Sequence, residues 1–309
     1  MSYKVIEKQV MSSDGVNTLC GKVYVPDGEI KGLFQIVHGM SEHIGRYDGF
    51  MGFLADNGFV AFGHDHVGHG KTAMRCGSFG YIAEKDGYKV LVDDVGVFAR
   101  TVTEDFPIKK HVLMGHSMGS FIARLYAAKH GKELAGLVIM GTSGPNPAAK
   151  IGIAVTGLMK RIYGARHISH LVHFLSMGSY NNRTDKKTEF DWLSVNEDNV
   201  KRYIDDDLCG FHFTVSAMQD LMNLIAQSNS RKWAGSIPRE LPVYIVSGGD
   251  DPVGGYGKGV KKVCAMLEKA GVADVEMKLY QGFRHEILNE NIFNQVCFDV
   301  LEFSQNRLF

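Results

Sequence analysis

Short apolar runs alternate with longer amphipathic stretches along most of this chain. The short runs predict β-strands at residues 5–10, 18–25, 32–37, 59–65, 111–114, 134–140, 242–246 and 275–280. Stretches with apolar positions three or four residues apart predict helices at residues 47–57, 87–103, 120–128, 257–270 and 292–305. This alternation favours an α/β fold, a mostly parallel central sheet with helices on both faces. The first two strands, joined by a turn at Ser13-Asp14-Gly15, would add an antiparallel hairpin at one edge.

The alternation stops between Gly144 and Ser236. Helical patterns there cover residues 151–163, 167–175, 196–203 and 213–226. We therefore expect an α/β core of residues 1–144 and 236–309, with residues 145–235 inserted as a helical cap. The aromatic residues and methionines of this segment could line an apolar pocket or could simply form the cap's own core: Phe174, Met177, Phe190, Trp192, Phe211, Phe213, Met218 and Met222.

Composition excludes several classes of protein. The 309 residues carry 34 Lys+Arg and 34 Asp+Glu, so no excess of positive charge argues for nucleic acid binding. No run of about eighteen apolar residues predicts a membrane-spanning helix, and the first residues do not have the pattern of a secretory signal. The cysteines are odd in number and form no Cys-x-x-Cys pair, which favours free thiols in the cytoplasm: Cys20, Cys76, Cys209, Cys264 and Cys297.

A candidate nucleophile lies between a predicted strand and a predicted helix. Residues 115–119 read Gly-His-Ser-Met-Gly and match Gly-x-Ser-x-Gly, a tight turn that lifts a serine above the end of a strand. The glycines suit the strained backbone and the close approach of strand and helix. Ser117 would be the nucleophile, and the N–H of Met118 at the helix N-terminus would stabilise an oxyanion. An ordinary glycine-rich turn is the alternative.

Two further groups complete a catalytic triad in the order that this turn requires. A serine needs a base, and the base needs a carboxylate to orient it, in the chain order Ser, Asp, His. Asp251 follows the strand at residues 242–246, and His285 follows the strand at residues 275–280. Asp250 is the alternative carboxylate, and we prefer Asp251. Other histidines fit less well, because they belong to other loops or break the order: His38, His43 and His130.

The second oxyanion donor should come from the loop after the third strand. His38-Gly39-Met40 occupies that loop, so the N–H of Met40 would pair with that of Met118.

A metal site is the competing interpretation for residues 64–69. They read His-Asp-His-Val-Gly-His, similar to the His-x-His-x-Asp-His of two-metal hydrolases, but Gly68 stands where that pattern needs Asp. We prefer a loop shaped by Asp65 and the glycines around His69.

Taken together, these residues resemble the α/β-hydrolase superfamily, and within it the monoacylglycerol lipase and lysophospholipase branch. Residues 38–47, His-Gly-Met-Ser-Glu-His-Ile-Gly-Arg-Tyr, look like that branch's HGxGEHxxRY signature, with Ser41 where the branch often has Gly. Residues 65–70, 115–119 and 248–253 are also similar, and residues 191–194 and 206–211 resemble bacterial members.

The resemblance covers nearly the whole chain. It implies a cofactor-free and metal-free serine hydrolase that cleaves a small lipid ester through an acyl-enzyme, with Ser117, Asp251 and His285 as the triad. The cap would cover the acyl chain, and its outer apolar face would allow transient contact with membranes or micelles. The alternatives are a general short-chain carboxylesterase, an aminopeptidase on the same fold, and a non-catalytic ligand receptor. The oligomeric state stays open.

Overall fold

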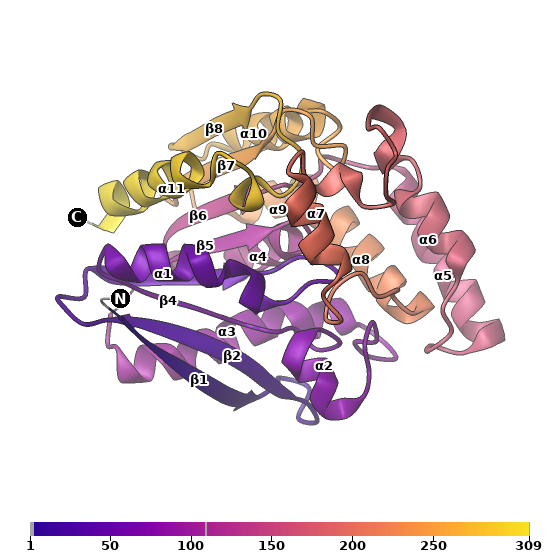
Figure 1. The fold of residues 1–309 in the computed structure, drawn as a ribbon, viewed down its shortest axis with the longest axis horizontal. Helices are drawn as coiled ribbons and strands as arrows, with labels where there is room; N and C mark the ends of the chain where they lie inside the picture. The colour runs from indigo at the N-terminus through magenta and orange to yellow at the C-terminus, as the bar shows by residue number, and fades with distance from the viewer. Residues whose placement is uncertain (1–2, 109, 309) are drawn as a thin grey trace.

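The computed structural model describes residues 3–108 and 110–308, and its centre is one twisted sheet of eight strands (Figure 1). The strands in chain order are β1 (Tyr3–Met11), β2 (Thr18–Pro26), β3 (Gly32–Val37), β4 (Phe59–His64), β5 (His111–His116), β6 (Leu134–Met140), β7 (Val243–Gly248) and β8 (Val275–Tyr280). Their order across the sheet is β1-β2-β4-β3-β5-β6-β7-β8.

The pairing of the strands confirms the predicted fold class. β1 pairs antiparallel with β2, and β2 pairs antiparallel with β4, whereas every other neighbouring pair is parallel. Strands β3 to β7 are buried along their whole length. Burial on both faces explains why these strands read as continuous apolar runs rather than as alternating ones.

Helices cover both faces of the sheet. Helices α1 (Asp48–Asp56) and α11 (Phe293–Leu308) pack on one face, where Phe50, Leu54 and Val300 belong to one apolar core. Helices α3 (Gly87–Asp105), α4 (Met118–His130) and α10 (Lys258–Ala270) contribute to the core of the other face. This arrangement brings the carboxyl ends of the parallel strands to one edge of the sheet, which is where open α/β sheets bind their ligands.

Two short helices were not predicted, and several strands end one or two residues away from their predicted ends. Helix α2 (Gly70–Cys76) and helix α9 (Arg231–Ser236) are too short to show a helical period. β5 and β7 each run two residues further than predicted, into Gly115-His116 and Ser247-Gly248. These glycines and polar residues are held in the strand by pairing with Met140 of β6 and Tyr280 of β8, so local propensity does not decide where the strands end.

Residues 145–235, which we call the inserted segment, lie between β6 and β7 and are mainly helical (Figure 1). Their helices are α5 (Ala148–Tyr163), α6 (His170–Met177), α7 (Glu197–Ile204), α8 (Val215–Ser228) and α9. The segment has no separate core, because Phe213 and Met218 are buried in the same cluster as α3 and α4. Phe174, by contrast, is 69% exposed. Among the described residues, no helix combines the length and apolar character that crossing a bilayer requires.

Four buried imidazoles gather where β3 and β4 end. His38 and His66 have ring centroids 4.1 Å apart, and His64 and His69 lie 5.3 and 5.8 Å from His66. Burial lowers the pKa of His66 to about 4 and of His69 to about 3, and it holds the pKa of His64 well below its usual range. Burial likewise holds the pKa of His38 well below its usual range, so all four rings are neutral at pH 7. Neither ring nitrogen of His64 has a hydrogen-bond partner among the described residues.

We predict that His64→Leu makes the protein less sensitive to acid. The unfolded chain takes up a proton at His64 below about pH 6.5 while the folded chain does not, so His64 destabilises the fold as the pH falls. The free energy of unfolding of the variant, relative to wild type, should rise by about 2 kcal/mol between pH 7 and pH 5. Urea denaturation at both pH values measures this difference.

Buried carboxyl groups also make the free energy of unfolding depend on pH, with the opposite sign. Their contribution cancels when the wild type is subtracted from the variant. Burial raises the pKa of Asp94 to about 6 and of Asp220 to about 7, and both groups are present in wild type and variant. A pH-independent difference between the two proteins would contradict the prediction.

Candidate active site

Ser117 occupies a strained turn between β5 and α4. Its backbone has φ 53° and ψ −120°, a left-handed φ that side chains with a Cβ rarely adopt, and its N–H donates to the carbonyl of Met140 at 3.0 Å. A Cβ at Gly119 would lie 2.0 Å from the carbonyl oxygen of Val37, and one at Gly115 would lie 2.2 Å from the carbonyl oxygen of Gly119. Both glycines of the motif are therefore required by close backbone contacts.

His285 and Asp251 form a buried pair on the loops after β8 and β7. His285 Nδ1 lies 2.9 Å from Asp251 Oδ2, and Asp251 also accepts hydrogen bonds from the Ser247 hydroxyl and the Val253 N–H. Burial alone would raise the pKa of Asp251, but the contact with His285 holds it below its usual value. The carboxylate thus stays ionised beside the imidazole. Among the described residues, His285 Nε2 has no partner.

The neighbouring aspartate takes a different position. Asp250 is exposed, and its N–H donates to the carbonyl of Phe283. It lines a cleft of about 260 Å³, together with Tyr180, Arg183, Trp192, Tyr256 and Arg284. The structure therefore brings Asp251, and not Asp250, against His285.

The loop after β3 lies directly against Ser117. A Cβ at Gly39 would lie 2.6 Å from Glu42 Oε1 and 3.1 Å from Ser117 Cβ, so a larger residue would push the loop away from both. Met40 follows Gly39, and its N–H has no acceptor among the described residues. Met118 is the first residue of α4, where a helix leaves its N–H groups without internal acceptors. Met118 follows Ser117 directly and Met40 follows the glycine that lies against it, so both predicted donors belong to backbone next to the serine.

Glu42 fixes this loop from inside the protein. It is 3% exposed, and its Oε1 accepts hydrogen bonds from the Gly39 N–H at 2.5 Å and from the Tyr47 hydroxyl at 2.9 Å. His116 Nδ1 lies 3.3 Å from the same oxygen. Burial would raise the pKa of Glu42, but His116 and Arg46 lower it well below its usual range, so the carboxylate is charged.

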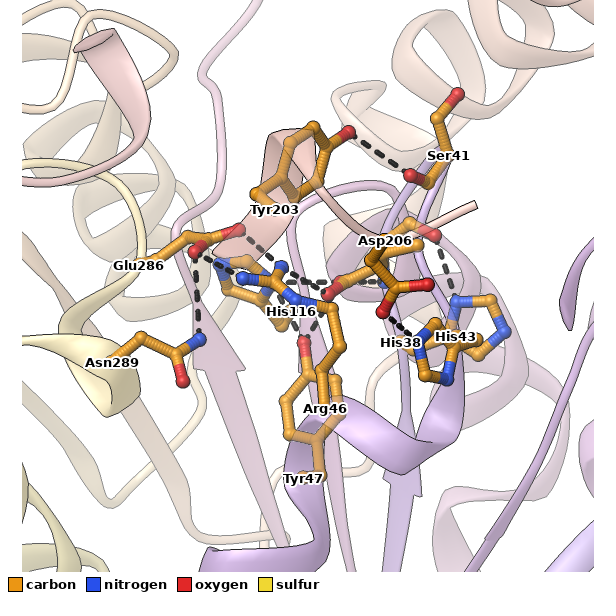
Figure 2. Close-up of polar contacts among 12 residues, drawn as sticks. His38, Ser41, His43, Arg46, Tyr47, His116, Tyr203, Asp206, Glu286 and Asn289 are labelled. Carbon is orange, nitrogen blue, oxygen red and sulfur yellow. Dashed lines mark hydrogen bonds and ion pairs between the residues drawn. The ribbon is translucent and has the colours of Figure 1, made fainter. Parts of the chain in front are cut away.

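Arg46 carries the network to the loop that holds His285. Its guanidinium lies 3.0 Å from Glu42 and makes a two-pronged ion pair with Glu286 at 2.5 and 2.7 Å (Figure 2). Glu286 also accepts from Asn199 of α7, and the carbonyl of His285 lies 3.3 Å from His116 Nε2. One buried network thus joins the loop of Met40, the turn of Ser117, the loop of His285 and the inserted segment.

Ser41 adds a second tie between the Met40 loop and the inserted segment. Its φ is +53°, the left-handed conformation that favours glycine, which gives a physical reason for the Gly often found here in the resembling branch. Its carbonyl accepts from the Tyr203 hydroxyl at 2.9 Å and from the Gly210 N–H at 3.0 Å (Figure 2). Its hydroxyl donates to the carbonyl of Phe211 at 2.7 Å. These bonds hold the strained serine in place.

Sequence reasoning missed the roles of these supporting residues. Glu42, Arg46 and Tyr47 stand in the signature quoted above, but the signature does not say what they contact. Trp192 belongs to the apolar residues of the inserted segment and to the stretch 191–194, but neither pattern predicts that its ring centroid lies 5.2 Å from that of His285. No local pattern reveals such a contact.

Neither metal candidate has the character of a built metal centre. His64, His66 and His69 do not bring three ligand atoms together; among the described residues only His43, Asp206 and Cys209 do so, with those atoms within 4.8 Å of one another. His43 Nε2 already lies 2.8 Å from Asp206 Oδ2, and burial raises the pKa of the Cys209 thiol far above neutral. A protonated thiol is a poor metal ligand, so this group reads as a polar tie between loop and segment.

Comparison with known proteins places the chain among hydrolases. Residues 28–292 match the model of the family described as serine aminopeptidase, S33. The monoglyceride lipase of Mus musculus is 26% identical over 97% of this chain and 90% of its own length. The structure of a highly thermostable carboxyl esterase from Bacillus coagulans, in complex with glycerol, is 32% identical, covers 99% of both chains and has a TM-score of 0.94. A lipase in its open form is 27% identical over 99% of both chains, with a TM-score of 0.90.

We predict that Glu42→Gln destabilises the protein by about 3–5 kcal/mol, because it leaves the buried Arg46 and His116 with less opposing charge. Urea denaturation at pH 7 measures the loss. Glu7→Gln is the matched control: Glu7 pairs with Lys71 at 2.6 Å, but on the surface. This control should cost less than about 1 kcal/mol. Equal effects of the two substitutions would show that the buried network does not hold the fold.

Proposed function

The chain belongs to the serine aminopeptidase S33 family of hydrolases, and we propose that it is a serine hydrolase of single-chain lipid esters such as monoacylglycerols and lysophospholipids. An ester-hydrolysing enzyme is what its esterase and lipase relatives indicate. The observation that carries the proposed mechanism is the 2.9 Å contact of His285 with Asp251, in the chain order that the Ser117 turn requires.

In the proposed reaction, His285 Nε2 takes the proton of the Ser117 hydroxyl as the serine oxygen attacks the ester carbonyl. Asp251 orients the ring and stabilises the imidazolium. The N–H groups of Met40 and Met118 donate to the oxyanion, each worth about 3–4 kcal/mol in the transition state. The alcohol leaves with the proton from His285. Water, deprotonated by His285, then attacks the acyl-enzyme and releases the acid and Ser117.

We assign the inserted segment, residues 145–235, as the cap over the acyl chain. Support comes from its ties to the site: α7 bonds Glu286 through Asn199 and the Met40 loop through Tyr203, and Trp192 contacts His285. The monoglyceride lipase relatives favour a glycerol monoester as substrate, as does the glycerol in the Bacillus coagulans carboxyl esterase. We also propose a cytoplasmic location, supported by the free thiols of all five cysteines.

An aminopeptidase activity is less well supported, despite the description of the family. Recognition of a free amine needs an unpaired acidic group near the serine. The acidic run at residues 205–207 is the nearest candidate for such a group, but Asp205 pairs with Lys201 at 2.5 Å and Asp206 Oδ2 lies 2.8 Å from His43 Nε2. Both carboxylates therefore already have side-chain partners. A non-catalytic receptor would have no use for the buried and ionised Asp251.

We expect Asp251→Asn to lower kcat by about 10⁴-fold, because an amide cannot stabilise the imidazolium and favours the wrong tautomer. Asp250→Asn is the matched control, one residue away on an exposed side chain, and should leave kcat within about twofold. Steady-state hydrolysis of a short p-nitrophenyl ester measures both variants. If Asp250→Asn were the damaging substitution, the assignment of the triad carboxylate would be wrong.

The substrate class is tested with a panel of monoacylglycerols and lysophospholipids of increasing chain length, short p-nitrophenyl esters and aminoacyl amides. We expect kcat/KM to rise with acyl-chain length and amides to remain uncleaved. Ser117→Ala should abolish turnover while leaving the circular dichroism spectrum unchanged. Cleavage of short esters alone would indicate a general carboxylesterase, cleavage of amides alone an aminopeptidase, and full activity of Ser117→Ala would refute the mechanism.

A further inference from the structure

A completely buried cation, Arg124, lies in α4, the helix that begins directly after Ser117. Burial lowers the pKa of its guanidinium to about 9, so the group is charged at pH 7. No carboxylate pairs with it among the described residues; its Nη2 donates to the carbonyl of Ser228 and to Asn229 Oδ1 at the end of α8. Burying a cation without an acidic partner costs stability, and its other contacts lead to the candidate nucleophile.

Two buried hydroxyl groups connect Arg124 with the turn of Ser117. Arg124 Nη1 donates to Thr142 Oγ1 at 3.1 Å, and Thr142 is the second residue after β6. Ser120 Oγ lies 2.8 Å from Thr142 Oγ1 and 2.5 Å from the carbonyl oxygen of Ser117. The side chains of Ser120 and Thr142 are both completely buried. These contacts form a chain of polar atoms from the guanidinium to the carbonyl of Ser117.

The guanidinium decides the direction of this chain. Arginine has N–H donors and no acceptor, so the Thr142 oxygen accepts from Arg124 and its own proton is left for another group. Among the described residues, Ser120 Oγ is the acceptor that this proton reaches. Ser120 then directs its single proton to the carbonyl oxygen of Ser117, 2.5 Å away. In the opposite direction two oxygens would face each other at that distance without a proton between them.

The chain ends on the peptide group that carries one of the predicted oxyanion donors. The carbonyl of Ser117 and the N–H of Met118 belong to the same trans peptide, so they point in opposite directions. The carbonyl accepts from the hydroxyl of Ser120 at 2.5 Å and from its N–H at 2.9 Å. Holding the carbonyl therefore fixes the direction of the Met118 N–H, and a hydrogen bond to the carbonyl also strengthens that N–H as a donor.

We propose that Ser120 and Arg124 are positioning residues for the oxyanion hole: the buried cation sets the direction of the hydroxyl chain, and Ser120 holds the peptide that presents the Met118 N–H. The proposal rests on the proposed function, in which this N–H binds the oxyanion. Neither positioning residue touches the substrate. Without the guanidinium, Ser120 can donate to Thr142 instead, and the peptide then loses its hydroxyl donor.

The first test removes the hydroxyl that contacts the carbonyl. Ser120→Ala should lower kcat for a short p-nitrophenyl ester by about tenfold and leave KM within about twofold, because an oxyanion donor acts in the transition state. Ser304→Ala is the matched control, since Ser304 is also completely buried and its hydroxyl donates to the carbonyl of Val300 at 2.7 Å. The control should change neither constant. A wild-type kcat in Ser120→Ala would overturn the proposal.

An alkyl trifluoromethyl ketone gives a second readout that a merely structural role would not move. Ser117 adds reversibly to the carbonyl carbon of this inhibitor, and the carbonyl oxygen becomes an oxyanion at the two proposed donors. Ser120→Ala should raise its inhibition constant by about tenfold, as it lowers kcat. The inhibition constant of the corresponding secondary alcohol, which forms no oxyanion, should stay within about twofold. Equal losses for ketone and alcohol would contradict a role in the oxyanion hole.

The role of Arg124 is tested with and without the hydroxyl of Thr142. Arg124→Met should lower kcat by about fivefold, because Ser120 can then donate to Thr142. Thr142→Val keeps the shape and leaves Ser120 only the Ser117 carbonyl as acceptor, so in that background Arg124→Met should change kcat by less than about twofold. Equal effects in both backgrounds would contradict transmission through Thr142. Urea denaturation checks that each variant folds, and Ser120→Ala tests the chain with the buried cation left in place.

These measurements distinguish the positioning role from the function proposed above. The short ester has no lipid chain, so the results do not depend on the substrate class. Wild-type kcat in Ser120→Ala beside an inactive Ser117→Ala would refute the positioning role alone. Full activity of Ser117→Ala would refute the proposed mechanism, and with it the oxyanion hole on which the positioning role rests.

Discussion

The site depends on one buried negative charge, the carboxylate of Glu42. A carboxylate removed from water is costly unless hydrogen bonds and opposite charges surround it. Here the Gly39 N–H, the Tyr47 hydroxyl, His116 and Arg46 do so. Gly39, Arg46 and Tyr47 belong to the same stretch as Glu42, whereas His116 directly precedes Ser117. Because Arg46 also reaches Glu286, satisfying the charge of Glu42 fixes how these parts lie relative to one another. The Gly39 N–H that donates to Glu42 stands one residue before the N–H of Met40, so this bond restrains the backbone that carries the proposed oxyanion donor.

Much of the fold could be predicted from the sequence because burial in a parallel sheet leaves a plain signal. Strands β3 to β6 are apolar runs, and the helices between them show a clear period. The candidate triad could be found because its members follow strands in a fixed chain order. The sequence does not decide which of Asp250 and Asp251 faces His285, because a shift of the turn by one residue would exchange the positions of the two side chains. Only the three-dimensional course of the loop decides it.

The supporting network lies beyond any local pattern. Glu42 and His116 are 74 residues apart, and Arg46 and Glu286 are 240 apart, so no spacing rule relates them. Tertiary packing likewise decides whether similar side chains are buried or exposed. Phe213 is completely buried beside α3 and α4, whereas Phe174, in the same helical segment, faces outward. From the sequence, both side chains could lie in a pocket or in the core. The sequence did not predict that Phe174 is exposed.

The inserted segment joins two regions of opposite chemistry. Its second half carries α7, whose Asn199 and Tyr203 bond the site network, and Asp206, which contacts His43. Its first half, α5 and α6, has no acidic residues and exposes large apolar side chains such as Leu158 and Phe174. Groups that share no contact contribute to stability and activity nearly independently. The exposed side chains of α5 and α6 therefore do not support the site, because the polar bonds that hold the Met40 loop to the segment come from α7, Asp206 and residues 210–211, not from α5 or α6.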